Sequence, residues 1–510
     1  MRASLPGRMA PTPRANQRVL LIQLDFQSWA TARPWSYSAA FGVQEGLSAN
    51  GVECVTVPAI AENPCSSPDS WVYHAKKALA GQCFDQVWVW LVHTPLDTAT
   101  LEWVASLAPI RVGVLMESLR YDDQDYAWAP QLKSRHGRLD AQLPYFTHVL
   151  APDERDAADL SARSSVKALW WPPMVPERYI TAPQGEPSQR QAVFHGTPYG
   201  RRQGWVNHAA LQQRLTFAKP AHPPSRNQVL FDRVQQTAAQ YLREGRTVTA
   251  VDMADYVRSL KKVRLGEFNE WMAQLPQWPA IVNLPSLAKF YGGRVFESMA
   301  AGRPVISWNI PDRPNNLGLF QEGREILLFN PDDPGKLARE IDRLLQDRSF
   351  ADSVAQNAQD RLRRFHTAER RLQQTLQWLE CGTVPDYGLT GSRLSQEIAQ
   401  LVPKAGATPP TRTLSPGVSE ECAVNNPPIG SAASIAQPIA HRLSPAVNGS
   451  NKVSDSFYVD LFVNKPGWST PEPNADEAAR WSKIASFLEH IIRESRKLDP
   501  ERRLRILDVG

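Results

Sequence analysis

Residues 291–308 read YGGRVFESMAAGRPVISW and join a glycine turn, a short helix and a strand. The pattern at 294–301 predicts about two helical turns, which Gly302 and Pro304 end. The apolar run at 305–308 then predicts a buried strand. A glycine turn before a helix presents N–H groups and the positive end of the helix dipole. The stretch therefore predicts an anion site, suited to a diphosphate, in an α/β fold.

Outward from that stretch, short apolar runs alternate with helical patterns, which predicts two parallel, doubly wound sheets. In a first domain, 17–175, strands are expected at 18–24, 53–57, 86–92, 111–116, 147–151 and 167–170, with a helix at 38–49. In a second domain, 176–385, strands are expected at 192–194, 279–284 and 305–308, with helices at 228–242, 336–345 and 350–379. Because ligands bind at the carboxyl ends of strands in such sheets, the two domains should face a cleft.

Three further segments flank these domains. Residues 1–16 carry three arginines but no apolar stretch, which predicts a disordered tail rather than a secretory signal. Residues 386–455 are rich in Pro, Ser, Ala and Asn and almost free of aromatic residues, so a flexible linker is expected. Residues 456–510 end in the strand-like string RLRILDVG and predict an incomplete α/β segment.

The bulk composition excludes several classes of protein. Of the 510 residues, 42% are hydrophobic and 21% are charged, which is typical of a globular chain and not of a coiled coil. No apolar run reaches the length of about 18 residues that a membrane helix needs. The net charge of +5 comes without a Lys/Arg block, so no nucleic-acid partner is expected. Five cysteines without a CxxC pair argue against disulfides and zinc and favour the cytoplasm.

Two glycine-bearing segments of the second domain are candidates for binding an anionic donor. In the first, Arg294 could contact phosphate, and Glu297 on the same helix face could accept hydrogen bonds from ribose hydroxyls. The alternative is a surface ion pair between the two side chains. In the loop at 195–204, three glycines permit close backbone approach, while Arg201 and Arg202 supply positive charge. The alternative there is a pair of solvated surface arginines.

Three residues that follow predicted strands of the first domain are candidates for catalysis: Asp25, His93 and Glu117. Side chains at the carboxyl ends of strands lie where ligands gather. A carboxylate there could act as a general base for an acceptor hydroxyl. For each residue the alternative is a structural or solvent-exposed side chain. The acidic string DDQD at 122–125 does not stand at a convincing place for metal ligands, so no metal is expected.

The strings FESMAAGRPVIS and FQEGREILLFNPDDPGKLAREIDRLLQD, followed by FHTAERRLQQTLQWL, resemble the nucleotide-sugar domain of GT-B glycosyltransferases. The likeness is to the group-1 type and to relatives similar to spore-coat maturation glycosyltransferases. It covers about 190–380 and, more loosely, 17–175. The resemblance implies two Rossmann-like domains that face a cleft.

The resemblance also implies roles for single residues. In such enzymes the Glu of an FEAMA-like block binds the donor ribose, which points to Glu297, and the next residue, Ser298, meets the diphosphate. Many retaining relatives carry a second Glu eight positions earlier, where this chain has Lys289, so the stereochemical outcome stays open. A histidine after a comparable strand meets the sugar, which points to His93. The remaining residues expected to bind the donor are Lys289, Gly293 and Arg294, together with Gly196, Thr197, Arg201 and, in reserve, Arg202.

These features predict a cytoplasmic, metal-independent glycosyltransferase with a nucleotide-sugar donor. A glycan or lipid-linked acceptor, a place in bacterial surface-polysaccharide assembly and peripheral membrane association are further expectations from the resemblance. The alternative is a non-catalytic, degenerate GT-B module that binds a nucleotide sugar or docks a fused domain. Lys289, in place of the common Glu, favours that alternative.

The C-terminal string RLRILDVG, residues 503–510, resembles the first strand of class I S-adenosylmethionine methyltransferases. In that family the strand leads into a glycine-rich turn that holds the cofactor. Because residues 456–510 are too few to build such a sheet, the expectation is a truncated glycosyltransferase–methyltransferase fusion. S-adenosylmethionine would bind only in the missing part, and no cofactor is expected in this chain.

Overall fold

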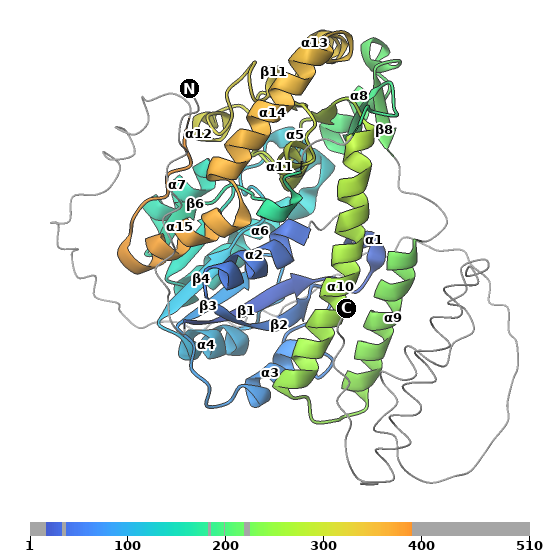
Figure 1. Ribbon diagram of the computed structural model, residues 1–510. Coiled ribbons are helices and arrows are strands. Elements are labelled where there is room, and N and C mark those ends of the chain that lie inside the picture. Colours follow the sequence, from blue (N-terminus) through green and yellow to red (C-terminus); the bar gives the residue numbers. More distant parts are fainter. Residues whose placement is uncertain (1–16, 33–36, 182–184, 198, 219–224, 390–510) are drawn as a thin grey trace, which may run out of the picture. The chain divides into compact units, whose positions relative to one another are not determined.

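A computed structural model describes residues 17–32, 37–181, 185–197, 199–218 and 225–389, which form two parallel sheets with their covering helices (Figure 1). The predicted tail at 1–16, nearly all of the predicted linker and the whole segment 456–510 lie outside the described residues. Within the described part, no helix is both long enough and apolar enough to span a membrane.

The first sheet has six strands in the order β2-β1-β3-β4-β5-β6, and every neighbouring pair is parallel. The strands are β1 (Arg18–Asp25), β2 (Glu53–Ile60), β3 (Gln86–Trp90), β4 (Ile110–Val114), β5 (His148–Ala151) and β6 (Lys167–Trp170). The helices of this domain are α1 (Trp29–Ala32), α2 (Tyr37–Ala49), α3 (Trp71–Ala78), α4 (Thr98–Leu107), α5 (Asp123–Trp128), α6 (Ser134–Gln142) and α7 (Glu154–Arg163). All six strands that the sequence predicts are confirmed.

The second sheet has five parallel strands in the order β11-β10-β9-β7-β8. They are β7 (Ala192–His195), β8 (Leu215–Ala218), β9 (Ile281–Asn283), β10 (Val305–Trp308) and β11 (Leu327–Phe329). The sequence reasoning missed β8 and β11, which are short edge strands. The covering helices include α8 (Gln203–Val206), α11 (Gly293–Ala300), α12 (Pro314–Leu317), α13 (Pro334–Gln346) and α14 (Arg348–Phe365). The predicted fold of two Rossmann-like, doubly wound domains is confirmed.

Both sheets reverse their strand order at an equivalent place. In the first sheet the reversal lies between β1 and β3, and in the second it lies between β7 and β9. The strands are apolar on both faces because helices cover both sides. Along β1, Val19 and Leu21 belong to a different buried cluster from Leu20 and Ile22, as the alternation of side chains in a strand requires.

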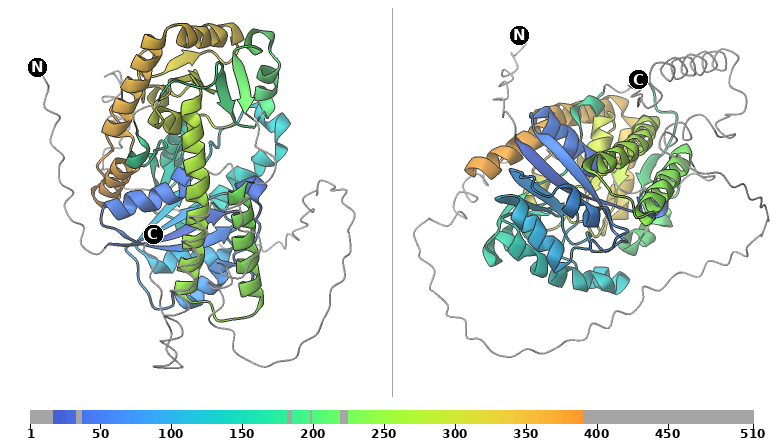
Figure 2. Two further views of the ribbon diagram at one scale, coloured as in Figure 1. Left: turned by 45° about the vertical axis from the view of Figure 1, so that its right-hand side comes forward. Right: turned by 90° about the horizontal axis from the view of Figure 1, so that it is seen from below.

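Two long helices of the second domain's chain segment pack on the first domain. These are α9 (Arg226–Arg243) and α10 (Ala250–Gln274), which stand side by side in Figures 1 and 2. Trp71 of α3 packs against Tyr256 of α10 with ring centroids 4.8 Å apart, and α10 also contacts β2. The sequence reasoning placed the helix at 228–242 in the second domain and missed α10. The structure shows instead a helical pair that reaches across to the first domain.

The last helix, α15 (Ala368–Cys381), also returns to the first domain and packs on α2. Leu372 and Leu376 share a buried cluster with Val43 and Leu47 of α2. Gly46 permits this close packing, because a Cβ there would lie 2.8 Å from the Ala368 carbonyl oxygen. The chain therefore crosses between the two domains several times, and its closing helix belongs to the core of the first.

Candidate functional site

The carboxyl ends of the two sheets face each other across a cleft. A cavity of about 360 Å³ lies there, between α5 of the first domain and two loops of the second, at 199–203 and 285–287. Those two loops follow β7 and β9, the strands at which the order of the second sheet reverses. In open parallel sheets that switch point is the usual place of a ligand. Of the two segments that the sequence singled out for donor binding, the loop at 195–204 lines this cavity, and α11 begins a few residues beyond the loop after β9.

Helix α11 follows the loop after β9 and begins at Gly293, with Gly292 as its N-cap. No side chain caps this helix end, so its backbone N–H groups and dipole suit an anion. Gly302 has a φ of 71° and ends the helix in the left-handed conformation that the sequence predicts. Ser298 is fully buried and donates its hydroxyl to the Arg294 carbonyl oxygen at 2.6 Å. The Ser298 hydroxyl is thus used within the helix, and the Ser298 carbonyl oxygen accepts from the Arg303 N–H at 3.1 Å.

Arg294 joins the two predicted donor segments, since its guanidinium donates to the carbonyl oxygen of His195 at the end of β7. Glu297, one helical turn further on, is only 2% exposed. Its carboxylate accepts a hydrogen bond of 2.9 Å from the indole N–H of Trp271 in α10. Sequence reasoning missed Trp271, because it belongs to a helix that was not predicted.

The loop after β7 approaches α11 closely at Gly196. A Cβ at this position would lie 2.6 Å from the Phe194 ring and 2.8 Å from Arg294 Nη1, so only glycine fits without displacement. Thr197 is exposed. The backbone of Arg201 lies in the turn at 200–202, next to the cavity.

Arg202 is held by the protein itself. Its guanidinium donates to the Pro285 carbonyl oxygen at 2.9 Å and lies over the rings of Tyr199 and Phe194, 4.6 and 5.1 Å from their centroids. Burial lowers the pKa of Arg202 below its usual range. Arg202 therefore connects the loops after β7 and β9. These contacts suit a structural role for its guanidinium better than direct binding of a phosphate.

His195 is enclosed by aromatic rings. Trp271 and Trp278 meet its imidazole edge-on, with centroids 4.6 and 6.0 Å away. Burial, together with the charge of Arg294, lowers the pKa of His195 to about 4. The ring is therefore neutral near pH 7, and it adds no charge to the donor site.

His93 and Glu117, two of the three predicted catalytic residues, come together beyond the carboxyl ends of the neighbouring strands β3 and β4. His93 Nε2 lies 3.8 Å from Glu117 Oε2, and Arg135 forms an ion pair with the same carboxylate. Arg135 also donates to the Tyr121 hydroxyl at 2.6 Å. Burial is the main cause that lowers the pKa of His93, so its imidazole is neutral near pH 7. The pair can therefore accept or pass on a proton.

The backbone just before His93 is strained. Val92 has a φ of 71°, a left-handed conformation that a β-branched residue rarely adopts. Its N–H donates to Gln142 Oε1 at 3.1 Å, which helps to hold the bend. Strain of this kind clusters at functional positions, where the surrounding structure fixes a side chain in place.

Asp25, the third predicted catalytic residue, lies elsewhere and is 2% exposed. Arg264 of α10 forms an ion pair with it at 3.2 Å, and Tyr256 and Gln235 donate to its other oxygen at 3.2 and 3.4 Å. Burial raises its pKa, although Arg264 acts in the opposite direction. The structure thus separates Asp25 from the other candidates, and these partners suit a carboxylate that anchors α10.

Lys289 bridges the cleft instead of standing free in it. Its ammonium lies 3.1 Å from Asp125 and 3.4 Å from Asp122, both of the first domain, and its backbone N–H donates to Ser118 Oγ at 2.7 Å. Asp125 and Ser286 line the cavity, and the Ser286 carbonyl oxygen accepts from the Lys289 ammonium. The acidic string 122–125 is therefore the partner of Lys289, and Asp122 also caps α5.

A second bridge across the cleft carries a buried ion pair. Arg313, which precedes α12, meets Asp153 in a bidentate pair at 2.6 and 3.0 Å. Asp153 is fully buried and Arg313 nearly so. Sequence reasoning missed both residues, since they are 160 positions apart. Asp153 follows β5 and Arg313 follows β10. A position after a strand is the sequence signal that could have identified them.

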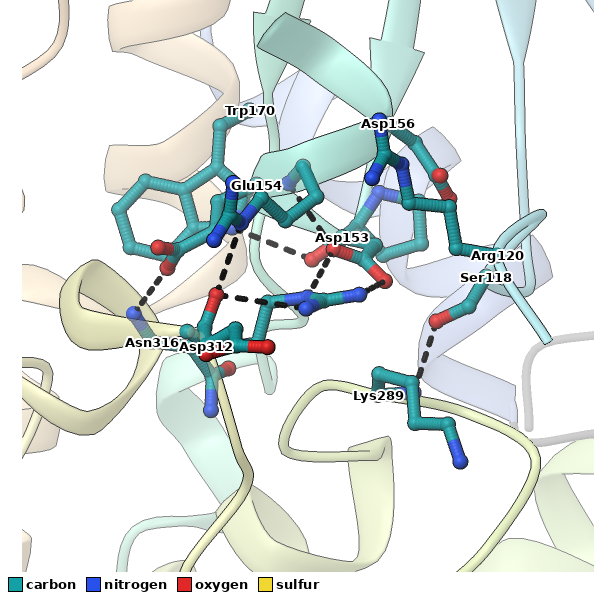
Figure 3. A network of polar contacts seen from close by, with 12 residues as sticks. Ser118, Arg120, Asp153, Glu154, Asp156, Trp170, Lys289, Asp312 and Asn316 are labelled. Atoms are coloured by element: carbon teal, nitrogen blue, oxygen red, sulfur yellow. Dashed lines mark hydrogen bonds and ion pairs between the residues drawn. The ribbon is translucent and has the colours of Figure 1, made fainter. Parts of the chain in front are cut away.

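Two more acids extend this bridge along α7. Glu154 accepts from the backbone N–H groups of Asn316 and Asn315 at 2.6 and 3.2 Å, so it caps the start of α12 from the other domain (Figure 3). Burial raises the pKa of Glu154 to about 7, although those N–H groups lower it. Burial and the charge of Asp153 likewise raise the pKa of Asp156 to about 7. The acid cluster is therefore sensitive to pH near neutrality.

No group of three or more His, Cys, Asp and Glu side chains has the arrangement of a metal site within the part of the chain that the structure describes.

Several solved structures are similar to this chain. Sucrose-phosphate synthase from Thermosynechococcus elongatus is 16% identical with a TM-score of 0.45, over 71% of this chain and 98% of that one. HepE from Anabaena in complex with UDP is 13% identical with a TM-score of 0.38, over 71% and 99%. An alpha-glucosyltransferase in complex with UDP and DNA is 12% identical with a TM-score of 0.45, over 71% and 99%.

At the level of sequence, no curated protein matches the chain. One family model does match, over residues 229–377, and its family is described as glycosyl transferase-like. That range runs from α9 to α15 and includes α11 with Arg294 and Glu297, as well as Trp271 and Lys289. The matched range does not include the loop at 195–204, the other segment predicted to bind the donor.

Proposed function

We propose that this chain is a glycosyltransferase, which moves a sugar from a nucleotide-sugar donor held by the second domain to an acceptor in the cleft. One observation carries the proposal. Helix α11, whose end no side chain caps, brings Arg294 and Glu297 to the loop after β7, at the switch point of the second sheet. Arg294 and Glu297 both lie within residues 229–377, the segment that the glycosyl transferase-like family model matches.

The donor would be held by its nucleotide part. In this proposal the N–H groups at the start of α11 and the guanidinium of Arg294 bind the diphosphate, and Glu297 accepts from the ribose hydroxyls. As the glycosidic bond breaks, negative charge grows on the leaving diphosphate, and fixed dipoles and cations stabilise that charge without having to reorganise. Arg201, beside the cavity, is the further cation that we propose for this task, and no metal ion is needed for it.

The acceptor would bind on the side of the first domain. His93 and Glu117 form the candidate pair for its hydroxyl, because a neutral imidazole beside a carboxylate can take up a proton as the oxygen attacks. The ion pair with Arg135 holds the Glu117 carboxylate in place. In our proposal His93 therefore receives the proton, and Glu117 orients the imidazole.

The test is binding and turnover together. Wild-type chain is titrated with UDP, GDP, ADP and CDP, and then incubated with the sugar nucleotides of the base that binds, with and without oligosaccharide acceptors. Selective binding of one nucleoside diphosphate, with its slow release from the sugar nucleotide, supports the proposal. A folded chain that binds no nucleotide contradicts it.

A second candidate function is nucleotide-sugar binding without transfer. Its support is Lys289, which stands where many retaining relatives carry a sugar-binding Glu and is engaged by Asp122 and Asp125. Binding of a sugar nucleotide that no acceptor and no length of incubation converts into nucleoside diphosphate would favour this reading.

The wider setting follows only from the sequence resemblance. We propose a cytoplasmic enzyme of bacterial surface-polysaccharide assembly, with a glycan or lipid-linked acceptor and peripheral membrane contact. The fused methyltransferase that residues 456–510 suggest belongs to the same proposal.

A further inference from the structure

Helix α10 connects the first domain to the candidate donor site. Arg264 in its middle forms the buried ion pair with Asp25 at the carboxyl end of β1, and both side chains are only 3% exposed. Tyr256, earlier in the helix, donates to the same carboxylate at 3.2 Å. These buried contacts fix α10 in position and rotation on the first domain.

Trp271 lies on the same face of α10, about two helical turns beyond Arg264. Its indole N–H donates to Glu297 Oε2 at 2.9 Å, and its ring meets the His195 imidazole edge-on at 4.6 Å. The Arg294 guanidinium lies 5.9 Å from the centroid of the same ring. One side chain from an inserted helix thus touches three residues of the donor segments.

We propose that Trp271 is a positioning residue of the donor site, which holds the Glu297 carboxylate in the orientation that accepts the ribose hydroxyls of a nucleoside diphosphate. This inference rests on the proposed function, because it takes Glu297 to be the ribose ligand. It adds a residue from a helix that is anchored on the other domain.

The chemistry of a carboxylate permits both roles. Its two oxygens offer about four acceptor positions, so one carboxylate can accept from an indole N–H and from ribose hydroxyls together. Because Glu297 is 2% exposed, water cannot replace the indole N–H as a donor at low cost. Without that N–H the carboxylate would turn toward another donor, such as a neighbouring guanidinium, and would no longer be oriented for the sugar.

The direct test is Trp271→Phe, which keeps an aromatic ring against His195 and Arg294 but removes the N–H donor. Calorimetric titration with UDP, GDP, ADP and CDP identifies the nucleoside diphosphate that binds best, and its 2′-deoxy form is then titrated for comparison. Wild type should prefer the ribose form by about tenfold, as expected for a hydrogen bond to a charged group. In Trp271→Phe this preference should fall to about twofold, with the affinity for the deoxy form nearly unchanged.

The matched control is Trp278→Phe, because Trp278 also packs on His195, with centroids 6.0 Å apart. This variant should keep the preference for ribose. A general loosening of the site would lower the affinity for both nucleotide forms equally, so the ratio separates positioning from mere packing. If Trp271→Phe does not fold, as judged by circular dichroism, Trp271→Leu, which also lacks a donor, replaces it in the comparison.

Glu297→Gln separates failure of this inference from failure of the proposed function. If Glu297→Gln abolishes the preference for ribose while the Trp271 variant keeps it, Trp271 is not a positioning residue, and the proposed function stands. If Glu297→Gln keeps the preference, or if folded wild type binds none of the four nucleotides, the ribose assignment fails and the inference is overturned with it.

Discussion

The buried pair of Arg313 and Asp153 makes a quantitative prediction for the substitution Arg313→Ala. Asp153 has no exposed surface and receives two hydrogen bonds from Arg313, at 2.6 and 3.0 Å. Removal of the guanidinium leaves a buried carboxylate without its cation. Breaking a buried pair in this way costs about 3–5 kcal/mol of unfolding free energy. The loss should include weaker docking of the two domains, because the pair joins α7 to the segment before α12.

The assay is urea unfolding at constant pH, followed by far-UV circular dichroism, with the m-value checked for each variant. Arg120→Ala is the matched control, because Arg120 pairs with Asp159 on the outside of the same helix, with side chains 49% and 40% exposed. Exposed pairs contribute about 0–1 kcal/mol. A combined variant, Arg313→Met with Asp153→Asn, should recover much of the loss, since it removes the unpaired charge and keeps a capping residue for α7. A loss below about 1 kcal/mol for Arg313→Ala would refute the reasoning.

Three further predictions concern pH and glycines. The raised pKa of Glu154, about 7 in the folded chain against 4.5, means that folding favours its protonated form, so the contribution of Glu154 to stability is largest below pH 4.5 and is lost as the pH rises through 7. Glu154→Gln should remove up to about 3 kcal/mol of that pH-dependent loss of unfolding free energy. Melting curves between pH 5 and 8 would measure the change, and a pH profile equal to that of wild type would contradict the prediction. Gly196→Ala should weaken nucleotide binding about tenfold, because its Cβ would displace Arg294 or the Phe194 ring, and calorimetry on the folded variant would show whether affinity survives. Gly302→Ala should lower the unfolding free energy by about 1 kcal/mol through strain at a φ of 71°, and equal stability would mean that the turn relaxes.

Much of the architecture could be predicted from the sequence, because parallel strands that are covered on both faces appear as short apolar runs. The six strands of the first sheet and three of the second were found in this way. The edge strands β8 (Leu215–Ala218) and β11 (Leu327–Phe329) were missed, because a run of three or four residues is too short to show a periodic pattern of apolar side chains.

Helix α10 was missed although its sequence carries two usable signals. Thr249 and Asp252 form a capping box, and apolar residues recur at helical spacing from Met253 to Phe268. The sequence does not show which domain this helix packs against. Its docking on the first domain depends on the pairing of Arg264 with Asp25, which lie 239 positions apart.

The candidate site was predicted best where it is local. Arg294 and Glu297 were found because a glycine turn, a helix start and their spacing lie within a few residues of sequence. Lys289 was expected to bind the donor, whereas the structure engages it with carboxylates of the other domain. Pairings of this kind, like Trp271 with Glu297, arise only when distant segments fold together, so their residues give no local signal.

The most direct test of the central claim is calorimetric titration of wild type and Glu297→Gln with the four ribonucleoside diphosphates, together with release of the same diphosphate from its sugar nucleotide. Wild type should bind one of them selectively and release it from the sugar nucleotide, whereas Glu297→Gln should bind it at least about tenfold more weakly without loss of fold. Equal binding by both proteins would contradict the assignment of Glu297, and no binding by folded wild type would contradict the proposed glycosyltransferase itself.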